Sequence, residues 1–149
     1  MPDQARLDPF NLRRFVAAQD NDRTFDRALA ELRRGAKESH WMWFIFPQLA
    51  GLGRTAKAAT FGITGRAEAE AYLAHRLLGP RLVQCADAAL QIQAGSAEQI
   101  FADDARKLRS SATLFAQLSP AGSVFHQLLS TYYHDVPDKL TIDLLQKDS

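Results

Sequence analysis

The sequence predicts an all-α protein, a single compact domain of about eight or nine short helices. Apolar residues recur at helical spacing along nearly the whole chain, helix-capping residues stand at short intervals, and convincing period-2 alternation is absent. The one candidate strand, residues 43–49, contains Pro47, which argues against it. No linker or low-complexity tract divides the chain, so we expect residues 1–149 to form one domain.

The N-terminal helices are indicated by their first and last residues. Asp8-Pro9 predicts an N-cap followed by proline at the first helical position, and a second helix is expected to begin near Asn21-Asp22. The second helix has an apolar stripe at helical spacing, formed by Phe25, Ala28, Leu29 and Leu32. Gly35 can then supply a left-handed stop.

The middle of the chain predicts several shorter helices. Ser39 is expected to cap an apolar helix from His40 to Phe46, which Pro47 ends. Further helices are expected over residues 55–61 and 66–75, and again after Gly79-Pro80. The last of these has an apolar stripe formed by Leu82, Cys85, Ala86 and Ala89.

The C-terminal helices are also marked by caps. Ser96 and Gln99 fit the capping-box pattern of a short helix, and Asp103 is expected to cap a helix that runs to about residue 119. Residues 124–133 form a further apolar pattern. Asp138 is expected to cap the last helix.

Charge and composition exclude several classes of protein. The formal net charge is +1, from 18 basic and 17 acidic side chains, and no long run of like charges occurs. We therefore do not expect a nucleic-acid partner, because phosphate neutralisation normally leaves a charge excess. The one opposing observation is a basic face on the second helix, formed by Arg23, Arg27, Arg33 and Arg34.

Location is inferred from the cysteine count and from the apolar runs. The longest strongly apolar run, residues 41–46, is too short to span a bilayer, and Met1 to Phe10 lacks the apolar core of a secretory signal. A single cysteine, Cys85, cannot form an intrachain disulfide and lies in an apolar stripe, which predicts a small core residue. We expect a cytoplasmic protein without membrane association.

The segment from Trp41 to Phe46 departs from an ordinary amphipathic pattern. Trp41 and Trp43 stand two positions apart, so on a helix they point in nearly opposite directions and the segment is apolar all round. The segment is then either a central core helix or a helix with one tryptophan at the floor of a cleft. His40, just before it, is either a packing residue or a general base, and it is the best catalytic candidate.

The predicted helix over 103–119 has polar residues on both of its faces. Arg109, Ser110 and Thr113 are assigned to a solvated face, whereas Ser111 falls inside the apolar arc and Lys107 near its edge. Ser111 can bond back to its own helix, and Lys107 can extend its head to water. Alternatively, both residues line a polar pocket between helices.

Two other segments supply weaker binding candidates. Gln19 shares a face with apolar residues, which predicts either a backbone partner or a position in a pocket wall. The loop Gly51-Leu52-Gly53 with Arg54 is either an ordinary turn or an anion site before the next helix. Gln48, at the end of the aromatic segment, is grouped with these candidates.

Familiar catalytic and cofactor signatures are absent from the sequence. No dinucleotide-binding or phosphate-binding glycine motif, nucleophile elbow or H-E-x-x-H pair occurs. The four histidines are scattered and cysteine pairs are missing, so we assign neither a metal site nor a cofactor.

Three stretches resemble a widespread bacterial family of unknown function, some of whose members are labelled calpastatin. The resemblance is carried by residues 8–12 and the string Ser39-His40-Trp41-Met42-Trp43-Phe44-Ile45-Phe46-Pro47-Gln48-Leu49 with residues 51–53. It continues through residues 72–73 and 78–82 to residues 107–111 with 113–115. It covers about residues 8–135 and implies a compact, mainly helical fold without an established activity. The family pattern implies glycine at Ala102 and methionine at Ala112.

Two functions from different classes follow. In the first, the chain binds a small planar or phosphate-bearing ligand between helices, with hydrolysis or group transfer as the associated reaction. The ligand-binding candidates are Gln19, His40, Trp41, Trp43, Gln48, Arg54, Lys107, Arg109 and Ser111. In the second, one side of the 41–46 helix joins Tyr132 and Tyr133 in an exposed aromatic patch that binds another protein.

Overall fold

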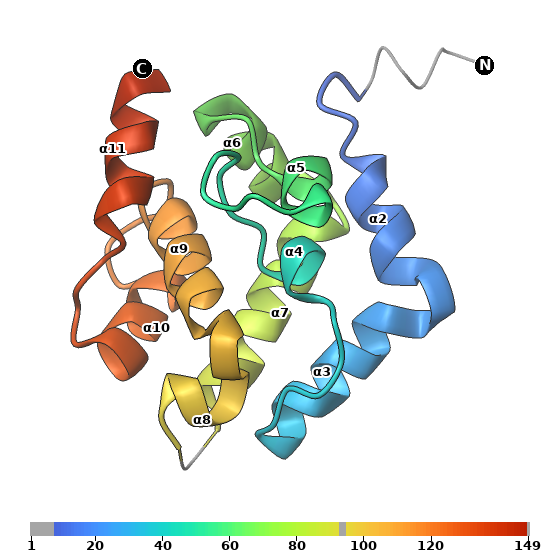
Figure 1. Ribbon diagram of the computed structural model, residues 1–149, viewed down its shortest axis with the longest axis vertical. Helices are drawn as coiled ribbons and strands as arrows, with labels where there is room; N and C mark the ends of the chain where they lie inside the picture. Colours follow the sequence, from blue (N-terminus) through green and yellow to red (C-terminus); the bar gives the residue numbers. More distant parts are fainter. Residues whose placement is uncertain (1–7, 93–94, 149) are drawn as a thin grey trace.

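The computed structural model describes residues 8–92 and 95–148, and every regular element in these ranges is helical (Figure 1). The elements are α2 (Arg13–Asp20), η1 (Asn21–Arg23), α3 (Thr24–Arg34), α4 (Met42–Ile45), α5 (Ala56–Phe61), α6 (Arg66–Ala74), α7 (Leu78–Leu90), α8 (Ala97–Phe101), η2 (Ala102–Asp104), α9 (Ala105–Ala116), α10 (Val124–Tyr133) and α11 (Lys139–Asp148). The predicted all-α class is confirmed. No helix in the described ranges combines the length and apolarity needed to cross a membrane. The expectation for residues 1–10 falls mostly on residues 1–7, outside the described ones.

Helix α7 lies between the N-terminal and C-terminal helices and packs against α3, α4, α6 and α10. Figure 1 shows α2 and α3 on one side of it and α9, α10 and α11 on the other. The predicted apolar stripe of α7 is buried against these neighbours, and the Cys85 side chain is fully enclosed. Burial raises the pKa of the Cys85 thiol to about 12. Cys85 is thus confirmed as a core residue.

A chain of aromatic rings joins the two sides of the molecule. The ring of Tyr72 in α6 lies 5.1 Å from that of Phe15 in α2 and 5.6 Å from that of Phe115 in α9, between centroids. Phe115 is in turn 5.6 Å from Phe125 of α10. These separations are typical of favourable aromatic pairs, so the helices share one continuous core.

An isolated bridge closes the loop that contains α5. The N–H of Ile63 donates to the carbonyl of Gln48 at 2.9 Å, and the N–H of Ala50 donates to the carbonyl of Ile63 at 2.8 Å. Gly62 permits this approach, because a Cβ there would lie 2.8 Å from the backbone of Ala50. The bridge thereby fixes residues 48–50 and the start of the loop before α5.

Most predicted caps are present. Ser96 and Gln99 form the capping box of α8, Gly35 ends α3 with φ +79°, and the Asp138 carboxylate accepts the Thr141 N–H at 3.0 Å. Asp8 also caps, because its carboxylate accepts the N–H groups of residues 12 and 13. The first helix nevertheless begins only at Arg13, because Asn11 has a left-handed backbone conformation that a right-handed helix cannot include.

Two predicted helix starts were wrong. The expected helix from His40 to Phe46 is a single turn, α4, and the Ser39 hydroxyl donates to the carboxylate of Glu31 on α3 instead of capping it. The expected helix from Asp103 begins instead with the 3₁₀ turn η2 and becomes α-helical at Ala105. Ser39 bonds to another helix, and Asp103 does not cap the start of η2 or α9.

The solvated face predicted for α9 is partly buried, which is a correction. Helix α11 packs against α9, and the Thr113 side chain is fully enclosed. Its hydroxyl donates to the Arg109 carbonyl at 2.8 Å and accepts the Asp138 N–H at 2.8 Å. Ser110 is also buried, and its hydroxyl donates to the Arg106 carbonyl at 3.1 Å. The hydroxyls of this face are therefore satisfied by backbone groups.

Candidate ligand-binding groove

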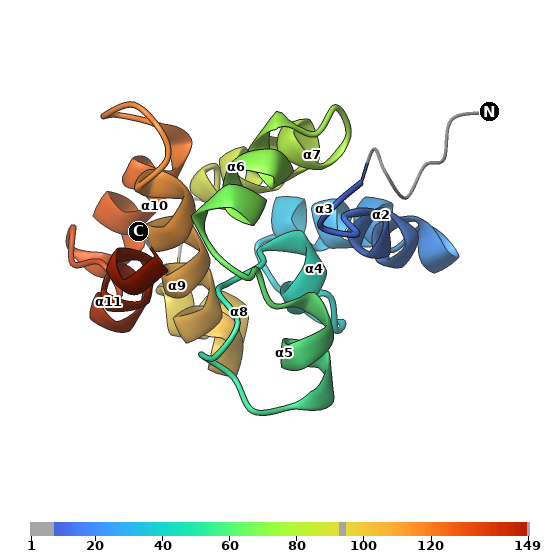
Figure 2. The same ribbon diagram turned by 90° about the horizontal axis from the view of Figure 1, so that it is seen from above.

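A groove of about 590 Å³ lies between the loop that precedes α5 and the N-terminal half of α9. Figure 2 shows α5 with this loop facing α9. We call it the Trp43 groove, and its lining residues are Trp43, Gln48, Leu52, Gly53, Thr55, Ala58, Asp103, Arg106, Lys107, Arg109, Ser110, Asp138 and Leu140. Gly53 allows the loop to approach α5 closely, because a Cβ there would lie 2.7 Å from the Cβ of Ala58.

Trp43 is the half-buried aromatic side chain of the groove. Two lysine ammonium groups lie near its ring. The Nζ of Lys57, on α5, is 5.0 Å from the ring centroid, and the Nζ of Lys107, on α9, is 5.5 Å from it. Both separations fall within the range of cation–π attraction. An indole ring accessible to solvent is thus combined with two ammonium groups.

Lys107 is held in place by an ion pair behind the groove. Its Nζ is 2.8 Å from Asp104 Oδ1, while the Nζ of Lys37 is 2.8 Å from Asp104 Oδ2. Partial burial opposes ionisation of Asp104, but hydrogen bonds from Lys107 and Lys37 and their charges lower its pKa below the usual range. One carboxylate therefore bridges two ammonium groups and directs Lys107 toward Trp43.

Two arginines complete the cationic side of the groove. The Nε of Arg109 donates to the Val136 carbonyl at 2.9 Å, and Arg106 is exposed one turn earlier on α9. Two acids, Asp103 and Asp138, also line the groove. Three cationic and two acidic side chains thus line the groove, and the Asp138 carboxylate is engaged in capping α11. The guanidinium and ammonium groups can donate to an anion.

The structure brings together four of the nine residues predicted from the sequence. Trp43, Gln48, Lys107 and Arg109 line the groove. The other five lie outside its lining: Gln19, Trp41 and Ser111 are buried, whereas His40 and Arg54 are exposed. Arg54 nevertheless lies in the loop between two lining residues, 53 and 55.

Gln19 belongs to a buried polar network on the other side of the molecule. Its amide nitrogen donates to the Phe44 carbonyl at 2.7 Å and to the Tyr72 hydroxyl at 3.3 Å, and its oxygen accepts from Arg81 at 3.1 Å. Each polar end of the side chain has a partner. Of the two alternatives left open by the sequence, internal pairing describes this residue.

Trp41 is a core residue anchored by a buried acid that the sequence analysis missed. The carboxylate of Glu31, only 2% exposed, accepts from the Trp41 indole N–H at 2.9 Å and from the N–H groups of Glu38 and Ser39 at 2.7 and 2.9 Å. Burial alone would raise the pKa of Glu31, but these bonds and that of the Ser39 hydroxyl lower it to about 2. The sequence did contain a sign of this role, because Glu31 lies one turn after Ala28, beside the apolar stripe of α3.

The proposed aromatic patch does not form. Phe44 and Phe46 are buried beside Trp41, and Trp43 alone of this segment's aromatics is half-exposed. Tyr132 and Tyr133 are half-buried and donate their hydroxyls to the carbonyls of residues 89 and 105, at 2.6 Å each. The basic face of α3 is also largely paired, with ion pairs at Arg23, Arg27 and Arg34.

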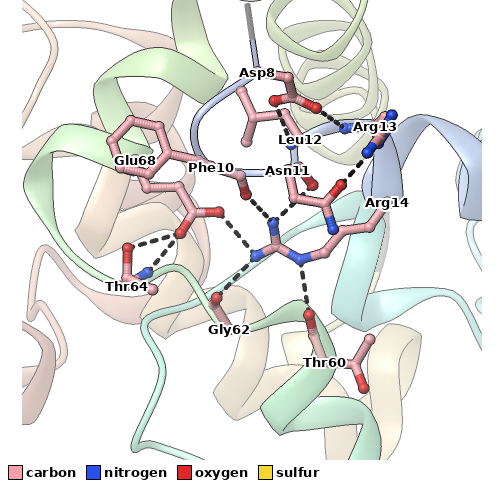
Figure 3. A network of polar contacts seen from close by, with 10 residues as sticks. All are labelled: Asp8, Phe10, Asn11, Leu12, Arg13, Arg14, Thr60, Gly62, Thr64 and Glu68. Atoms are coloured by element: carbon pink, nitrogen blue, oxygen red, sulfur yellow. Dashed lines mark hydrogen bonds and ion pairs between the residues drawn. The ribbon is translucent and has the colours of Figure 1, made fainter. Parts of the chain in front are cut away.

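A second polar cluster, centred on Arg14, was also missed (Figure 3). Its guanidinium donates to the carbonyls of residues 10, 11, 60 and 62 and to the Glu68 carboxylate, at 2.7–3.1 Å. Glu68 is 1% exposed, and its other oxygen accepts from the N–H and hydroxyl of Thr64 at 2.9 Å. The cluster joins the α2 entry to both ends of the α5–α6 connection, so it supports one wall of the groove.

Comparison with known proteins finds a family and a solved relative. The model of a family described as "Protein of unknown function (DUF1810)" matches residues 9–145. The crystal structure of the conserved hypothetical protein Rv1873 from Mycobacterium tuberculosis is similar, with 48% sequence identity and a TM-score of 0.90, over 93% of this chain and 99% of that one. No curated protein matches the chain significantly.

Proposed function

The chain belongs to the DUF1810 family of proteins of unknown function, and for this member we propose that the Trp43 groove binds a small planar ligand bearing a phosphate. The observation that carries the proposal is the position of Trp43, with the ammonium groups of Lys57 and Lys107 within 5.5 Å of its ring centroid. A planar base stacks on the indole, and the cations of the groove neutralise the phosphate.

The cation–π contacts of the two lysines can be exchanged for a phosphate, while Lys107 keeps its ion pair with Asp104. A cation–π contact at a partly exposed site is worth about 0.5–1 kcal/mol. A hydrogen bond between charged groups is worth roughly 1.5–3 kcal/mol, so a phosphate is the stronger partner for either ammonium group. Asp104 keeps Lys107 near the ring in the free protein, and the ligand therefore meets an ordered cation.

The proposal concerns binding. His40, the sequence's candidate general base, is exposed and outside the groove lining, and it takes no part in the proposed contacts. Ser111 is enclosed in the core side of α9 and likewise contributes no contact to the ligand. Gln48, Thr55 and Ser110 are the neutral polar residues that line the groove beside the cations.

The test is calorimetric titration with AMP, supported by thermal shift. At 100 times its dissociation constant AMP should stabilise the protein by about 2.7 kcal/mol. Lys107→Ala should weaken AMP binding about ten- to a hundredfold, the loss expected for one charge-assisted hydrogen bond, and Trp43→Ala should weaken it as well.

The matched control is Arg23→Ala, which removes a cation whose side chain is 85% exposed on η1. This variant should bind AMP as the wild type does. Melting temperatures without ligand check that each variant is folded. If AMP does not bind, or if Lys107→Ala and Arg23→Ala bind it equally, the proposed site is wrong.

A further inference from the structure

A second hollow adjoins the Trp43 groove on the other flank of α9. Its volume is about 550 Å³, and Tyr133, Glu98 and Ala102 help to line it. Three of its lining residues, Asp103, Arg106 and Arg109, also line the Trp43 groove. We call it the Tyr133 hollow. The groove and the hollow therefore meet along these three side chains at the start of α9, and we call the two together the trough.

The trough has an aromatic ring at each end and two guanidinium groups between them. Arg106 and Arg109 are three residues apart on α9 and so occupy one face of the helix. Beyond them on one flank lies Trp43, and on the other flank the ring of Tyr133 lies 5.8 Å from the Arg109 guanidinium carbon. The Tyr133 hydroxyl donates to the Ala105 carbonyl at 2.6 Å, which fixes the ring at the edge of the hollow.

Two acidic residues of the trough are positioned to bind the sugars of a nucleotide. Asp103 lies where groove and hollow meet, and Glu98 lines the Tyr133 hollow. A carboxylate beside a phosphate site can accept hydrogen bonds from ribose hydroxyls, as acidic residues do in dinucleotide-binding folds. The trough therefore offers guanidinium groups for phosphates and carboxylates for sugar hydroxyls.

The backbone at Ala102, next to Asp103, has a conformation that favours glycine. Its φ is +51° with ψ −127°, a region that residues with a Cβ rarely adopt. This agrees with the glycine implied by the family pattern at this position. The turn directs α8, with Glu98, against the start of α9 and so shapes the edge of the hollow.

We propose that the ligand of the trough is a dinucleoside with a 5′–5′ pyrophosphate link. This inference rests on the proposed function and names its ligand class. One base lies on Trp43 and the other on Tyr133, with the pyrophosphate over Arg106 and Arg109. The rings flank one α-helix, whose diameter with side chains is about 10–12 Å, and an extended ligand with two sugars and two phosphates spans such a width.

The linkage follows from where the charges lie. In a 5′–5′ pyrophosphate both phosphates stand between the two nucleosides, opposite the two arginines. A 3′–5′ strand places a single phosphodiester between successive nucleosides and leaves one of the arginines without a phosphate. A mononucleotide leaves one of the two rings unused.

The inference is tested by titration with AMP, ADP, diadenosine 5′–5′ pyrophosphate and the dinucleotide pApA. Diadenosine pyrophosphate should bind at least tenfold more tightly than ADP. ADP carries at least as much negative charge, so this gain comes from the second nucleoside. Base–aromatic stacking of roughly 1–3 kcal/mol per base accounts for a change of this size.

Substitutions of Tyr133 and of its neighbour Tyr132 test whether the second aromatic ring contributes to binding. Tyr133→Leu should remove the advantage of diadenosine pyrophosphate over ADP, whereas Tyr133→Phe should retain it. Tyr132→Leu is the matched control, because Tyr132 is also half-buried with its hydroxyl on a backbone carbonyl, at residue 89, but lies outside the hollow's lining. In the wild type, the Tyr133 ring protons should shift in NMR spectra with diadenosine pyrophosphate and not with ADP, a measurement that needs no variant.

Equal affinity for ADP and diadenosine pyrophosphate would overturn this inference and leave the proposed function standing. Tighter binding of pApA than of diadenosine pyrophosphate would also overturn it, as would an advantage that survives in Tyr133→Leu. Failure of all four compounds to bind would instead remove the proposed function on which the inference rests.

Discussion

At the scale of single residues, Glu31 shows how a buried charge can organise a segment. Its carboxylate accepts from two backbone N–H groups, the Ser39 hydroxyl and the Trp41 indole, so no oxygen is left without a donor. These four hydrogen bonds, donated by residues 38, 39 and 41, fix the chain between α3 and α4. The Trp41 side chain is thereby buried in the core, and the Trp43 side chain, two residues later, lies in the groove.

Glu31→Gln should destabilise the fold by about 2–4 kcal/mol at pH 7. The amide keeps one acceptor oxygen but loses the charge. Its NH₂ group either meets N–H donors, which cannot accept a hydrogen bond, or requires the Ser39 hydroxyl to change from donor to acceptor. The folded pKa of about 2 lies below the ordinary value of 4.5, so the ionised carboxylate stabilises the fold above about pH 4.5. This stabilisation is lost as the pH falls from about 5 toward 2.

Urea unfolding of both proteins at pH 7, 4 and 3 checks this prediction. The difference in unfolding free energy between the wild type and Glu31→Gln should shrink as the pH falls. The control is Glu70→Gln, an exposed acid with a surface ion pair, which should change stability by less than about 1 kcal/mol. A difference that is the same at pH 7 and pH 3 would contradict the assigned role of the charge.

At the scale of elements, the Arg14 cluster ties three segments that are distant in sequence. Arg14→Lys should cost about 2 kcal/mol or more, because an ammonium group cannot reproduce five fork-shaped donations and leaves Glu68 poorly paired in the core. Hydrogen exchange should accelerate most at the amides of residues 62–64 and in α5, and less in α9.

The neighbour of Arg14 supplies the control. Arg13 is exposed, and its side chain donates to the Asn11 side chain at 3.1 Å, so Arg13→Lys should leave both stability and exchange nearly unchanged (Figure 3). Equal effects of the two substitutions would show that the cluster contributes only as surface charge. An increase spread evenly over all helices would show that α5 has no separate dependence on it.

Elements defined by local chemistry were predictable from the sequence. The Ser96 capping box and the Gly35 stop depend on residues within one helical turn, and both are present. The start of α4 was not predictable, because the Ser39 hydroxyl bonds to an acid on another helix. The burial of Thr113 also depends on a distant element, α11, which no helical wheel of α9 contains.

The candidate site was predictable only in part, for the same reason. Lys107 and Trp43 each broke a local pattern and were singled out, and the structure brings them to one groove. Trp41 and Trp43 could not be told apart, since their segment is apolar all round and a distant acid, Glu31, decides which is buried. Gln19 broke the pattern just as clearly, yet its partners lie in the core.

At the scale of the whole molecule, the reactivity of Cys85 tests whether the helices unfold as one cooperative unit. The thiol is fully buried on the inner face of helix α7, and its pKa is raised to about 12, so neither access nor thiolate is available in the folded state. Labelling requires that the helices packed around α7 separate. If the chain is one cooperative unit, this separation is global unfolding.

We therefore expect a thiol reagent at pH 8 to label Cys85 at least about 10³ times more slowly than an exposed thiol, since a stable domain is open for a fraction of about 10⁻³ or less. The exposed reference is Val83→Cys in a Cys85→Ala background, because Val83 lies on the same helix and is 43% exposed. The logarithm of the Cys85 labelling rate should rise with urea at the slope of global unfolding. A much shallower slope would mean that α7 is exposed by a partial opening, and that α2 and α3 on one side can separate from α9, α10 and α11 on the other. Rapid labelling in native buffer would contradict the burial of Cys85 between α7 and its neighbours altogether.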